Sequence, residues 1–569
     1  MKRLLALLLV SLLVLPLFAC ASTPKTDAPA ADSSTTNTPA DDAPAGDTPA
    51  DDTAEADQPA DGEPAADDNG LVWPRLANDD VTLTLMTFLP NEISSLVTRV
   101  DHPDNIPWNE APRRTGVNLD ITTLSSMAFA EQMKLALAAE DFMDIMNVSR
   151  HYAGGLDQAY EDGNFVCLSD HEDWIPNYLT WVYANDNNRK AAHTDGGHIM
   201  AFSQVTERLE PGWCGYTVRR DWLDELGMEP PETIAEWEDM LMTFKEKKTG
   251  GEAPLDLYRT ALPSSNHFSG AYNVCWSGLI KVDGQLQYCF VSDGWRQYME
   301  LLHSWYDKGL IEPDFFSSNN PQHEADKERL ARNVIGAAHL ITSAVGSYYA
   351  DMGLAPEGAY YELVGNASLE KGVPSKVTFN GDDVSCLLWP YGWMIWANGE
   401  HPDIATKFMD YFYSEEGSIL TNYGIEGDTF YYDENGKPQF TDKVMHNDKG
   451  LYFFGAIHYY LINNGLTLLI DRNELSLSEE ALRYKECWGQ IGEYRMSAAL
   501  SFTAEEASEY SAIQSDLDVK REEMFAKWIT GEVELNDDTW NTYLDEMEQI
   551  GWRRYLEIQQ AAYDRWLVK

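Results

Sequence analysis

The alternation of apolar and polar positions is clearest between residues 216 and 250. Four large apolar residues recur there at helical spacing, which predicts a helix with one buried face: Ile234, Trp237, Leu241 and Phe244. Thr233 and Glu236 fit a capping box at the start of this helix. A short β-prone run, Tyr216–Arg219, precedes a second helix predicted over Asp221–Leu226 and closed by Gly227. The segment therefore predicts a strand–helix–helix unit of an α/β domain.

Strands and helices also alternate in the first part of the folded body. The pattern predicts strands over Val81–Phe88, Val117–Thr122 and Phe142–Val148, with an amphipathic helix over Phe129–Ala139. Such alternation is typical of a parallel sheet, in which ligands bind beyond the carboxyl ends of the strands. Polar residues in the loops that follow these strands are therefore binding candidates: Asn91, Glu92, Ser149 and Arg150. The alternative is that they are ordinary solvated loop residues.

The later part of the chain continues with strands and ends in helices. A strand is predicted over Val334–Ile341, and another apolar run covers Ser385–Ala397. Asp433–Pro438 has the composition of a hairpin turn. From Glu479 onward the pattern is helical, and Thr503–Glu506 fits a second capping box. The body is thus predicted to be α/β with a helical carboxyl end.

The first twenty residues carry the features of a lipoprotein signal peptide. Lys2 and Arg3 precede an apolar run, Leu4–Phe18, that is too short for a comfortable membrane-spanning helix. The run ends in Leu17-Phe18-Ala19-Cys20, which resembles a bacterial lipobox. We therefore expect acyl chains such as palmitate on Cys20, anchoring the protein at the extracytoplasmic face of the cell membrane. The alternative is an ordinary cleaved signal peptide with a chance cysteine.

The next fifty residues, Ala21–Gly70, are rich in Ala, Pro, Asp and Thr and lack aromatic residues. Such a segment cannot bury enough apolar surface to offset its chain entropy. Its 13 acidic residues and single lysine give it a charge of −12. We expect a disordered, self-repelling tether that holds the folded body away from the membrane.

The remaining chain, about 500 residues, is long enough for two lobes with their own cores. The whole chain has a formal charge of −52, of which the tether contributes −12 and the amino end +2, so the body has a charge of −42. This charge repels phosphate backbones, so we expect no nucleic-acid partner. The 18 tryptophans and 29 tyrosines suit stacking on sugar rings, although aromatic residues also fill cores.

Six cysteines remain besides Cys20: Cys167, Cys214, Cys275, Cys289, Cys386 and Cys487. Disulfides formed outside the cell and buried free thiols are equally compatible with their scatter. No cysteine spacing fits a zinc site, and no nucleophile elbow, phosphate loop, dinucleotide fingerprint or zinc-protease motif occurs. We therefore expect no catalytic residue, no metal and no cofactor.

Several motifs follow one another in a distinctive order: Arg219–Gly227, Pro231–Thr233, Ala235–Trp237, Gly309–Phe316, Asp410–Gly417, Trp528–Glu532 and Gln559–Arg565. In this order they resemble the family 1 extracellular solute-binding proteins, which are carbohydrate-binding lipoproteins of ABC importers. The resemblance implies the type II periplasmic-binding-protein fold, with two α/β lobes, a hinge, an interlobe cleft and carboxyl-terminal helices. It also implies a domain order: 71–212 and 391–490 in lobe one, 213–390 and the completing helices 491–569 in lobe two.

The same resemblance implies the function. The chain would be a monomeric, membrane-tethered protein that captures a sugar or oligosaccharide and delivers it to the permease subunits of an ABC transporter. It would not be an enzyme. Two alternatives remain open, namely a secreted glycan-processing enzyme and a ligand-binding protein that feeds a sensor kinase.

Candidate ligand contacts follow from the positions that match the family. Five aromatic residues are expected to stack on sugar rings, with core packing as the alternative role of each: Trp213, Phe268, Trp276, Tyr348 and Trp393. Arg219 and Asp221, together with Glu92 and Arg150, are expected to hydrogen-bond sugar hydroxyls. Many relatives carry a calcium loop after the helix that ends here near Lys248. Lys247–Glu252 supplies only one carboxylate, so that site is predicted to be lost.

Overall fold

The computed structural model describes residues 72–126, 128–208, 212–259, 261–316, 325–378, 387–462, 466–490, 492–494, 496 and 500–569. All of these residues belong to one compact unit. The signal peptide, Cys20 and the acidic tether lie outside the described residues, as does Cys386. Among the described helices, none combines the length and the apolar character needed to cross a membrane.

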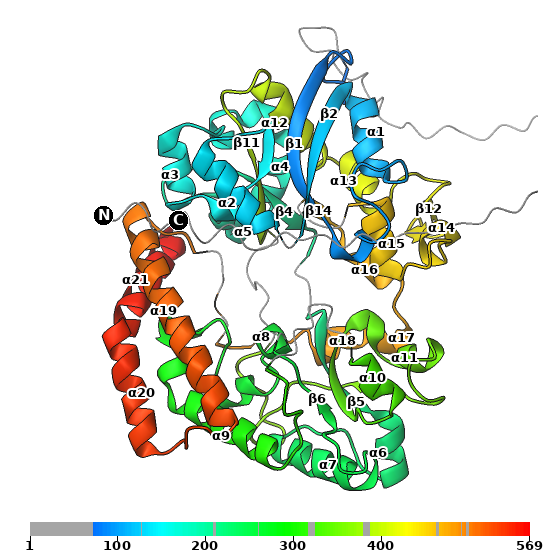
Figure 1. Cartoon of the computed structure of the whole chain (residues 1–569). Coiled ribbons are helices and arrows are strands. Elements are labelled where there is room, and N and C mark those ends of the chain that lie inside the picture. The colour runs from blue at the N-terminus through cyan, green and yellow to red at the C-terminus, as the bar shows by residue number, and fades with distance from the viewer. Residues whose placement is uncertain are drawn as a thin grey trace, which may run out of the picture. The chain divides into compact units, whose positions relative to one another are not determined.

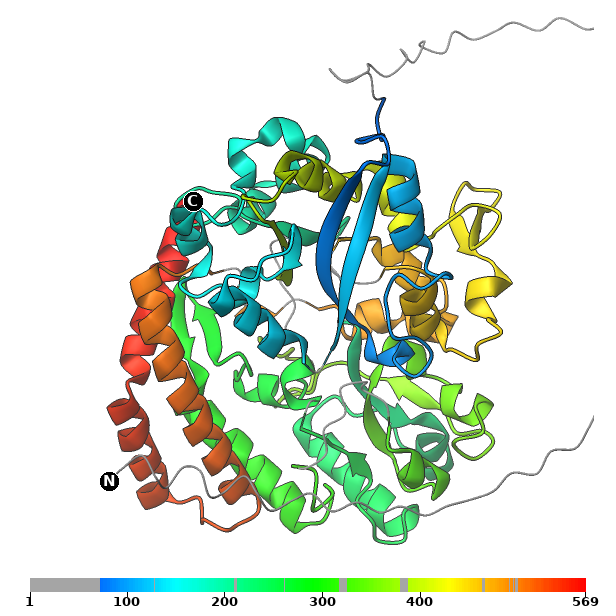
Figure 2. The same ribbon diagram turned by 45° about the horizontal axis from the view of Figure 1, so that its top comes forward.

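A six-stranded sheet organises the first group of elements, here called lobe one (Figure 1). Its order is β14-β4-β11-β3-β1-β2, with these bounds: β1 Val81–Leu89, β2 Val117–Ser125, β3 Ile145–Asn147, β4 Phe202–Thr206, β11 Leu387–Ile395 and β14 Thr467–Leu468. β1 pairs in parallel with both β2 and β3, and β11 runs antiparallel to β3 and β4. The parallel arrangement predicted for the first three strands is confirmed, and β1 and β2 lie side by side in Figure 2.

The third strand is shorter than the predicted Phe142–Val148. Asp144, just before β3, accepts hydrogen bonds from the backbone N (2.8 Å) and Oγ1 (2.7 Å) of Thr84 on β1. This side-chain contact occupies the place of a regular ladder and delays the start of the strand to Ile145.

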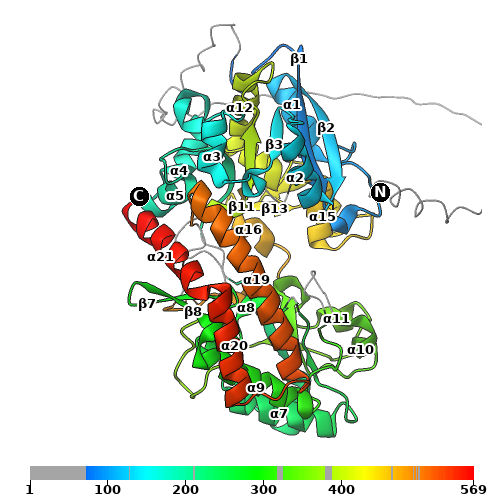
Figure 3. The ribbon, with the colours of Figure 1, turned by 60° about the vertical axis from the view of Figure 1, so that its left-hand side comes forward.

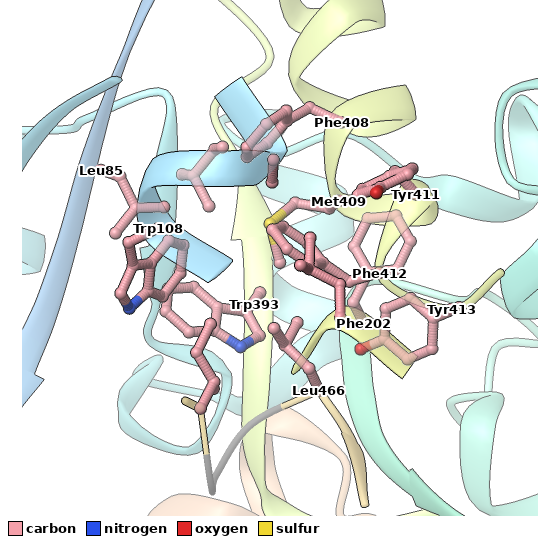
Figure 4. Packing of buried hydrophobic residues seen from close by; sticks show 14 of the residues in the cluster. Leu85, Trp108, Phe202, Trp393, Phe408, Met409, Tyr411, Phe412, Tyr413 and Leu466 are labelled. Carbon is pink, nitrogen blue, oxygen red and sulfur yellow. The ribbon is translucent and has the colours of Figure 1, made fainter. Parts of the chain in front are cut away.

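Helices cover the faces of this sheet: α1 Ile106–Thr115, α2 Phe129–Ala139, α3 Gly155–Asp162, α4 Pro176–Val182, α5 Asp186–Ala192, α12 Pro402–Tyr411, α13 Glu415–Asn422, α14 Asp442–Met445, α15 Phe453–Tyr460 and α16 Ile470–Glu474. The apolar face of α12 packs on the sheet through Phe408 and Met409, which belong to the same buried cluster as Phe202 of β4 (Figure 4). A hairpin of β12 (Phe430–Tyr432) and β13 (Pro438–Phe440) confirms the predicted turn.

A four-stranded sheet organises the second group, here called lobe two. Its order is β10-β5-β9-β6, with these bounds: β5 Cys214–Arg219, β6 Leu255–Asp256, β9 Ala337–Ile341 and β10 Tyr361–Leu363. The surrounding elements are α6 Arg220–Leu226, α7 Ile234–Lys247, α8 Ala261–Ser265, α9 Asp293–Asp307, α10 Lys327–Ala331, α11 Tyr348–Asp351 and the hairpin β7 Leu279–Val282 with β8 Gln285–Tyr288. β5 is antiparallel to both of its neighbours, while β6 and β9 are parallel.

The local predictions for the start of lobe two are confirmed. Thr233 and Glu236 form both hydrogen bonds of a capping box at the amino end of α7. Gly227 ends α6 with φ +66°, a conformation that glycine adopts without the strain a Cβ would cause. The predicted apolar face of α7 is buried throughout.

The chain ends in five helices: α17 Glu479–Leu482, α18 Tyr484–Cys487, α19 Ala504–Ile529, α20 Asp537–Ile550 and α21 Trp552–Val568. The predicted capping box of Thr503 and Glu506 begins α19. α17 and α18 pack with Tyr361 and Leu363 of lobe two, and Nε1 of Trp488 donates to the carbonyl of Val364 (3.1 Å). These two helices thus pack with the four-stranded sheet, although they precede residue 490, where the expected domain order places the return to lobe two.

Five of the six body cysteines are described, and none of them forms a disulfide in the described part of the structure: Cys167, Cys214, Cys275, Cys289 and Cys487. Four of them are buried in the lobe cores. For these five residues the structure decides the open alternative in favour of thiols.

Candidate functional site

A pocket lies in lobe one where β1 and β3 reach their carboxyl ends. Its lining combines aromatic, aliphatic and polar side chains: Thr87, Phe88, Pro90, Val100, Asn105, Trp108, Asn147, Trp393, His458, Leu461 and Ile462. The cavity measures about 50 Å³. Pockets that enclose a small-molecule ligand typically measure about 300–1,000 Å³. This pocket is therefore too small to enclose such a ligand by itself.

Two tryptophans give the pocket an aromatic base. Trp393 on β11 pairs with Asn147 on β3 across the antiparallel ladder, and Trp108 comes from α1 (Figure 4). Gly392 precedes Trp393, and a Cβ there would lie 2.1 Å from Oγ of Ser149. Only glycine lets β11 pass this close to the segment after β3, so the backbone itself holds Trp393 beside the end of that strand.

Asn105 shapes one side of the pocket. Its Oδ1 accepts from the backbone N of Trp108 (3.3 Å) and so caps α1. Its Nδ2 donates to the carbonyls of Tyr459 (3.3 Å) and Leu461 (3.1 Å), at the end of α15. One buried amide thereby joins two helices that are far apart in the sequence, and it fixes Trp108 and Leu461 as neighbours in the pocket wall.

His458 and Glu92 supply the ionisable groups next to the pocket. Nδ1 of His458 lies 3.7 Å from Oε2 of Glu92, which belongs to the short 3-10 helix Asn91–Ile93 after β1. Burial lowers the pKa of His458 to about 4, although the Glu92 carboxylate acts in the opposite direction. The imidazole is therefore neutral near pH 7, and the carboxylate contributes the charge of this pair.

The structure brings four of the sequence-based candidates to this side of lobe one. Asn91 and Glu92 follow β1, Arg150 lies in the 3-10 helix Ser149–His151 after β3, and Trp393 lines the pocket. Asn91 is exposed, whereas Trp393 is only 2% exposed. The side chain of Arg150 lies outside the described part of the structure. Whether these residues contact a ligand stays a prediction.

Trp213 and Tyr348 lie at one common end of the lobe-two sheet. The carbonyl of Trp213 accepts from the backbone N of Thr342 (3.0 Å), next to the pairing of Cys214 with Ile341. Tyr348 follows β9 at this end, and the segment after β6 begins here too, because β6 is parallel to β9. Trp213 is 38% exposed, so its indole is accessible to a partner molecule.

Phe268 and Trp276 take the alternative role of core packing. Phe268 is 2% exposed and meets the rings of Trp237, Trp305 and Tyr216 at centroid distances of 5.0, 5.1 and 4.7 Å. These ring contacts support the core-packing alternative for Phe268 and give no support to its expected role in stacking on a sugar. Trp276 is half-buried and packs on Phe525 at 5.4 Å, with the guanidinium of Arg521 5.8 Å from its ring centroid.

Arg219 and Asp221 lie at the opposite end of β5 from Trp213. Arg219 donates from Nε (2.7 Å) and Nη2 (2.6 Å) to the two carboxylate oxygens of Asp221, and from Nη1 to Oδ1 of Asn333 (2.7 Å). Its guanidinium also lies 4.4 Å from the ring centroid of Trp222. The pair is thus built into the start of α6, and this placement gives no support to a role in ligand binding.

Sequence reasoning missed His458, Asn147 and Asn105. His458 is the one polar residue in the apolar run of α15, Phe453–Tyr460, and such an isolated residue is a usable signal. Asn147 ends the third strand, at the position where the rule for parallel sheets places ligand contacts. Within the described residues no three His, Cys, Asp or Glu side chains are arranged to hold a metal ion.

The chain was compared with known proteins at the level of sequence and of structure. No family model matches it. The fructooligosaccharide ABC transporter substrate-binding protein FusA of Streptococcus pneumoniae is 21% identical over 520 residues, covering 85% of this chain and 90% of that protein. The polygalacturonan/rhamnogalacturonan-binding protein YtcQ of Bacillus subtilis is 21% identical over 240 residues, covering 41% of this chain and 47% of that protein. One of these relatives is thus named as an ABC transporter substrate-binding protein for fructooligosaccharides and the other as a polysaccharide-binding protein.

Comparison with solved structures identifies the fold of the chain. FusA in complex with kestose has a TM-score of 0.68 at 19% identity, covering 86% of this chain and 99% of that structure. The extracellular solute-binding protein from Bifidobacterium longum subsp. infantis has a TM-score of 0.68 at 17% identity, covering 88% and 100%. The chain has the two-lobed solute-binding fold. In this fold, the α/β lobes and helical carboxyl end expected from the sequence are confirmed.

Proposed function

We propose that the chain captures a sugar or oligosaccharide between its two lobes and delivers it to the permease subunits of an ABC transporter. The observation that carries this proposal is the pocket at the carboxyl ends of β1 and β3, with Trp393 and Trp108 beside Asn147. Aromatic rings stack on the apolar faces of sugar rings, and an asparagine amide both donates to and accepts from hydroxyls. The homologues bind sugars for ABC transporters, which supports the same assignment.

The small volume of this pocket supports capture by two lobes. A cavity of about 50 Å³ leaves most of a sugar outside lobe one. Hinge closure would bring lobe two over the exposed side of the ligand, with Trp213 and Tyr348 as the proposed contacts. The chain would act as a binding protein and not as an enzyme, because binding by closure needs no reacting group.

Thermal-shift screening of the chain against mono- and oligosaccharides, with product analysis of every hit, tests the proposal. A ligand that binds only the folded state raises the melting temperature by mass action. A rise with the sugar recovered intact is the expected result. If the sugar is recovered cleaved, the chain is a glycan-processing enzyme and the binding-protein proposal is rejected. The absence of a shift with every sugar would reject a saccharide ligand while leaving the fold unaffected.

The amino end would tie this function to the cell surface. We propose that Cys20 carries acyl chains and that Ala21–Gly70 tethers the folded body outside the cytoplasmic membrane, where the permease lies. Labelling of cells with a clickable palmitate analogue should mark the wild-type chain and leave a Cys20→Ser variant unmarked. Equal labelling of both chains would overturn the anchor.

A further inference from the structure

The carboxyl-terminal helices are built into the core of lobe two. Phe525 and Trp528 of α19, Tyr543 of α20 and Tyr555 of α21 belong to the same buried cluster as Trp295 of α9. The hydroxyl group of Tyr543 also donates a hydrogen bond to the carbonyl oxygen of Phe290 (3.0 Å). α19 and α21 lie side by side over much of their length (Figure 3). These helices therefore move with lobe two as one rigid piece.

The far end of α21 is bound to lobe one. Asp195 lies between α5 and β4, and its side chain is only 11% exposed. Its Oδ2 accepts from Nε of Arg565 (2.6 Å), and its Oδ1 accepts from Nζ of Lys569 (3.1 Å) and from Oγ of Ser501. Burial alone would raise the pKa of Asp195, but its bonds to Ser501, Arg565 and Lys569 hold the pKa below its usual range.

Further bonds secure the same end of the helix. Nζ of Lys569 donates to the carbonyl of His193 (2.6 Å), and Nζ of Lys190 donates to the carbonyl of Leu567 (3.1 Å). The ammonium of Lys190 also lies 5.3 Å from the ring centroid of Trp566. We call Asp195, Arg565 and Lys569 the α21 anchor. It connects α5 and the loop after it to a helix that belongs to the core of lobe two.

Arg565 links the anchor to a second helix. Its Nη1 and Nη2 donate to the two carboxylate oxygens of Glu506 (2.9 and 2.6 Å), in the first turn of α19. One guanidinium thus joins lobe one to both long helices of lobe two. The bidentate pairing with Glu506 fixes the plane of the guanidinium within lobe two, and a single bond from Nε to Asp195 (2.6 Å) then joins it to lobe one. One charged bond of this kind resists separation of the lobes while it permits a small rotation.

We propose that the α21 anchor is a pivot of the hinge: Asp195 and Arg565 stay paired while the lobes open and close, and they position lobe two by limiting how far it swings. After α16 the chain passes from lobe one to lobe two through Leu475–Ser478, which form neither a helix nor a strand. Such a connection sets no limit on opening by itself, whereas two stiff helices held at one end do. The proposal rests on the two-lobed fold and does not depend on the identity of a sugar.

The test measures interlobe distances in the full chain without sugar. Two exposed residues, Thr98 of lobe one and Glu357 of lobe two, are replaced by unnatural amino acids that react with a spin label by click chemistry. This labelling leaves the natural cysteine thiols unmodified. Pulsed electron resonance then gives the distance distribution. We expect Arg565→Gln to widen this distribution and lengthen its mean, and Arg565→Lys to restore part of the wild-type profile.

Arg554→Gln is the matched control. Arg554 also lies on α21 and holds a carboxylate of α19 with two bonds, to the Oε atoms of Glu509 at 3.0 and 2.8 Å. Loss of the Arg554 guanidinium should leave the distribution of interlobe distances unchanged. Asp195→Asn, which cuts the same contact from lobe one, should reproduce the effect of Arg565→Gln and covers the case in which that variant folds poorly. If Arg565→Gln and Arg554→Gln give the same distance distribution, the proposal is overturned. A shift of the Arg565→Gln distribution to shorter distances would also overturn it, because the anchor would then hold the lobes open.

Discussion

Nδ1 of His458 lies 3.7 Å from Oε2 of Glu92, and His458 is one of the side chains that line the lobe-one pocket. Burial lowers the pKa of His458 to about 4, so the imidazole stays neutral near pH 7 while Glu92 carries its negative charge. Among the described side chains that line the pocket, none is a lysine or an arginine, and the nearby Arg472, whose Nη1 donates to the carbonyl of Ile462 (3.2 Å), is fully buried. The described part of the site is therefore suited to a ligand without negative charge.

We predict that the chain prefers uncharged saccharides to uronates of equal length. Two like charges about 4 Å apart repel by roughly 1 kcal/mol in water and more in a partly buried site, which corresponds to about a tenfold loss of affinity. Titration calorimetry with a neutral oligosaccharide and an oligogalacturonate, each at low and high salt, measures the difference. The uronate should bind more weakly and should gain affinity as salt screens the repulsion. A uronate that binds more tightly, and loses affinity with salt, would contradict this prediction.

Asn147 is predicted to hydrogen-bond the sugar from the end of β3. Asn147→Ala should weaken binding of the saccharide found in the screen by about tenfold, the effect of losing one or two neutral hydrogen bonds. Asn435→Ala, in the exposed hairpin turn, is the matched control and should bind as the wild type does. Equal affinity of the two variants would remove Asn147 from the site.

Features that depend on a few neighbouring residues could be predicted from the sequence. The capping box of Thr233 and Glu236 involves four consecutive residues, and Gly227 ends a helix through its own backbone conformation. The order of strands and helices followed from the alternation of apolar residues, which reflects burial of one face of each element. These features need no knowledge of distant contacts.

The candidate site depends on contacts between distant residues, which the sequence does not reveal. Asn105 binds carbonyls 354 and 356 residues further along the chain. Phe268 could equally have faced a ligand or a core, and only its enclosure by Trp237 and Trp305 decides between them. Arg219 and Asp221 were reasonable ligand contacts until their bidentate pairing at the far end of β5 became visible. Pairing and burial are properties of the fold, so residue type alone predicts them poorly.

Asp410 is predicted to be a stabilising cap of another helix. This buried carboxylate on α12 accepts from the backbone N (3.2 Å) and Nδ2 (2.7 Å) of Asn177 and from the backbone N of Tyr178 (2.8 Å), in the first turn of α4. Asp410→Ala should lower the free energy of unfolding by about 1–3 kcal/mol, because these donors lose their acceptor. Urea unfolding at pH 7 measures the change, and an Ala variant as stable as the wild type would contradict the role.

The same residue has a defined pH dependence. Burial raises the pKa of Asp410 from 3.8 to about 6, against the hydrogen bonds that lower it. The folded state therefore holds this proton more tightly than the unfolded state, and ionisation costs stability as the pH rises from about 4 to about 6. The side chain of the Asp410→Asn variant does not ionise. As the pH rises from 4 to 7, the free energy of unfolding of this variant should therefore increase relative to that of the wild type. A constant difference across this range would show that the carboxyl group titrates normally.

His267 is predicted to make the fold sensitive to acid. It is 2% exposed, packs against Tyr216, Trp237 and Phe268, and neither ring nitrogen has a hydrogen-bond partner in the described structure. Burial lowers its pKa to about 3. The unfolded state gains a proton near pH 6.5 and the folded state does not, so stability is fully present above pH 6.5. It falls by about 1.4 kcal/mol per pH unit as the pH drops towards 3.

Replacing His267 by leucine tests this sensitivity directly. His267→Leu removes two unpaired nitrogens from an apolar site, so the free energy of unfolding at pH 7 should stay equal or rise. Between pH 6.5 and pH 4 the variant should lose less stability than the wild type in urea unfolding, because one titrating group has gone. If the His267 variant loses stability with acid as steeply as the wild type, His267 must take up its proton in the folded state and its enclosure would have to be incomplete.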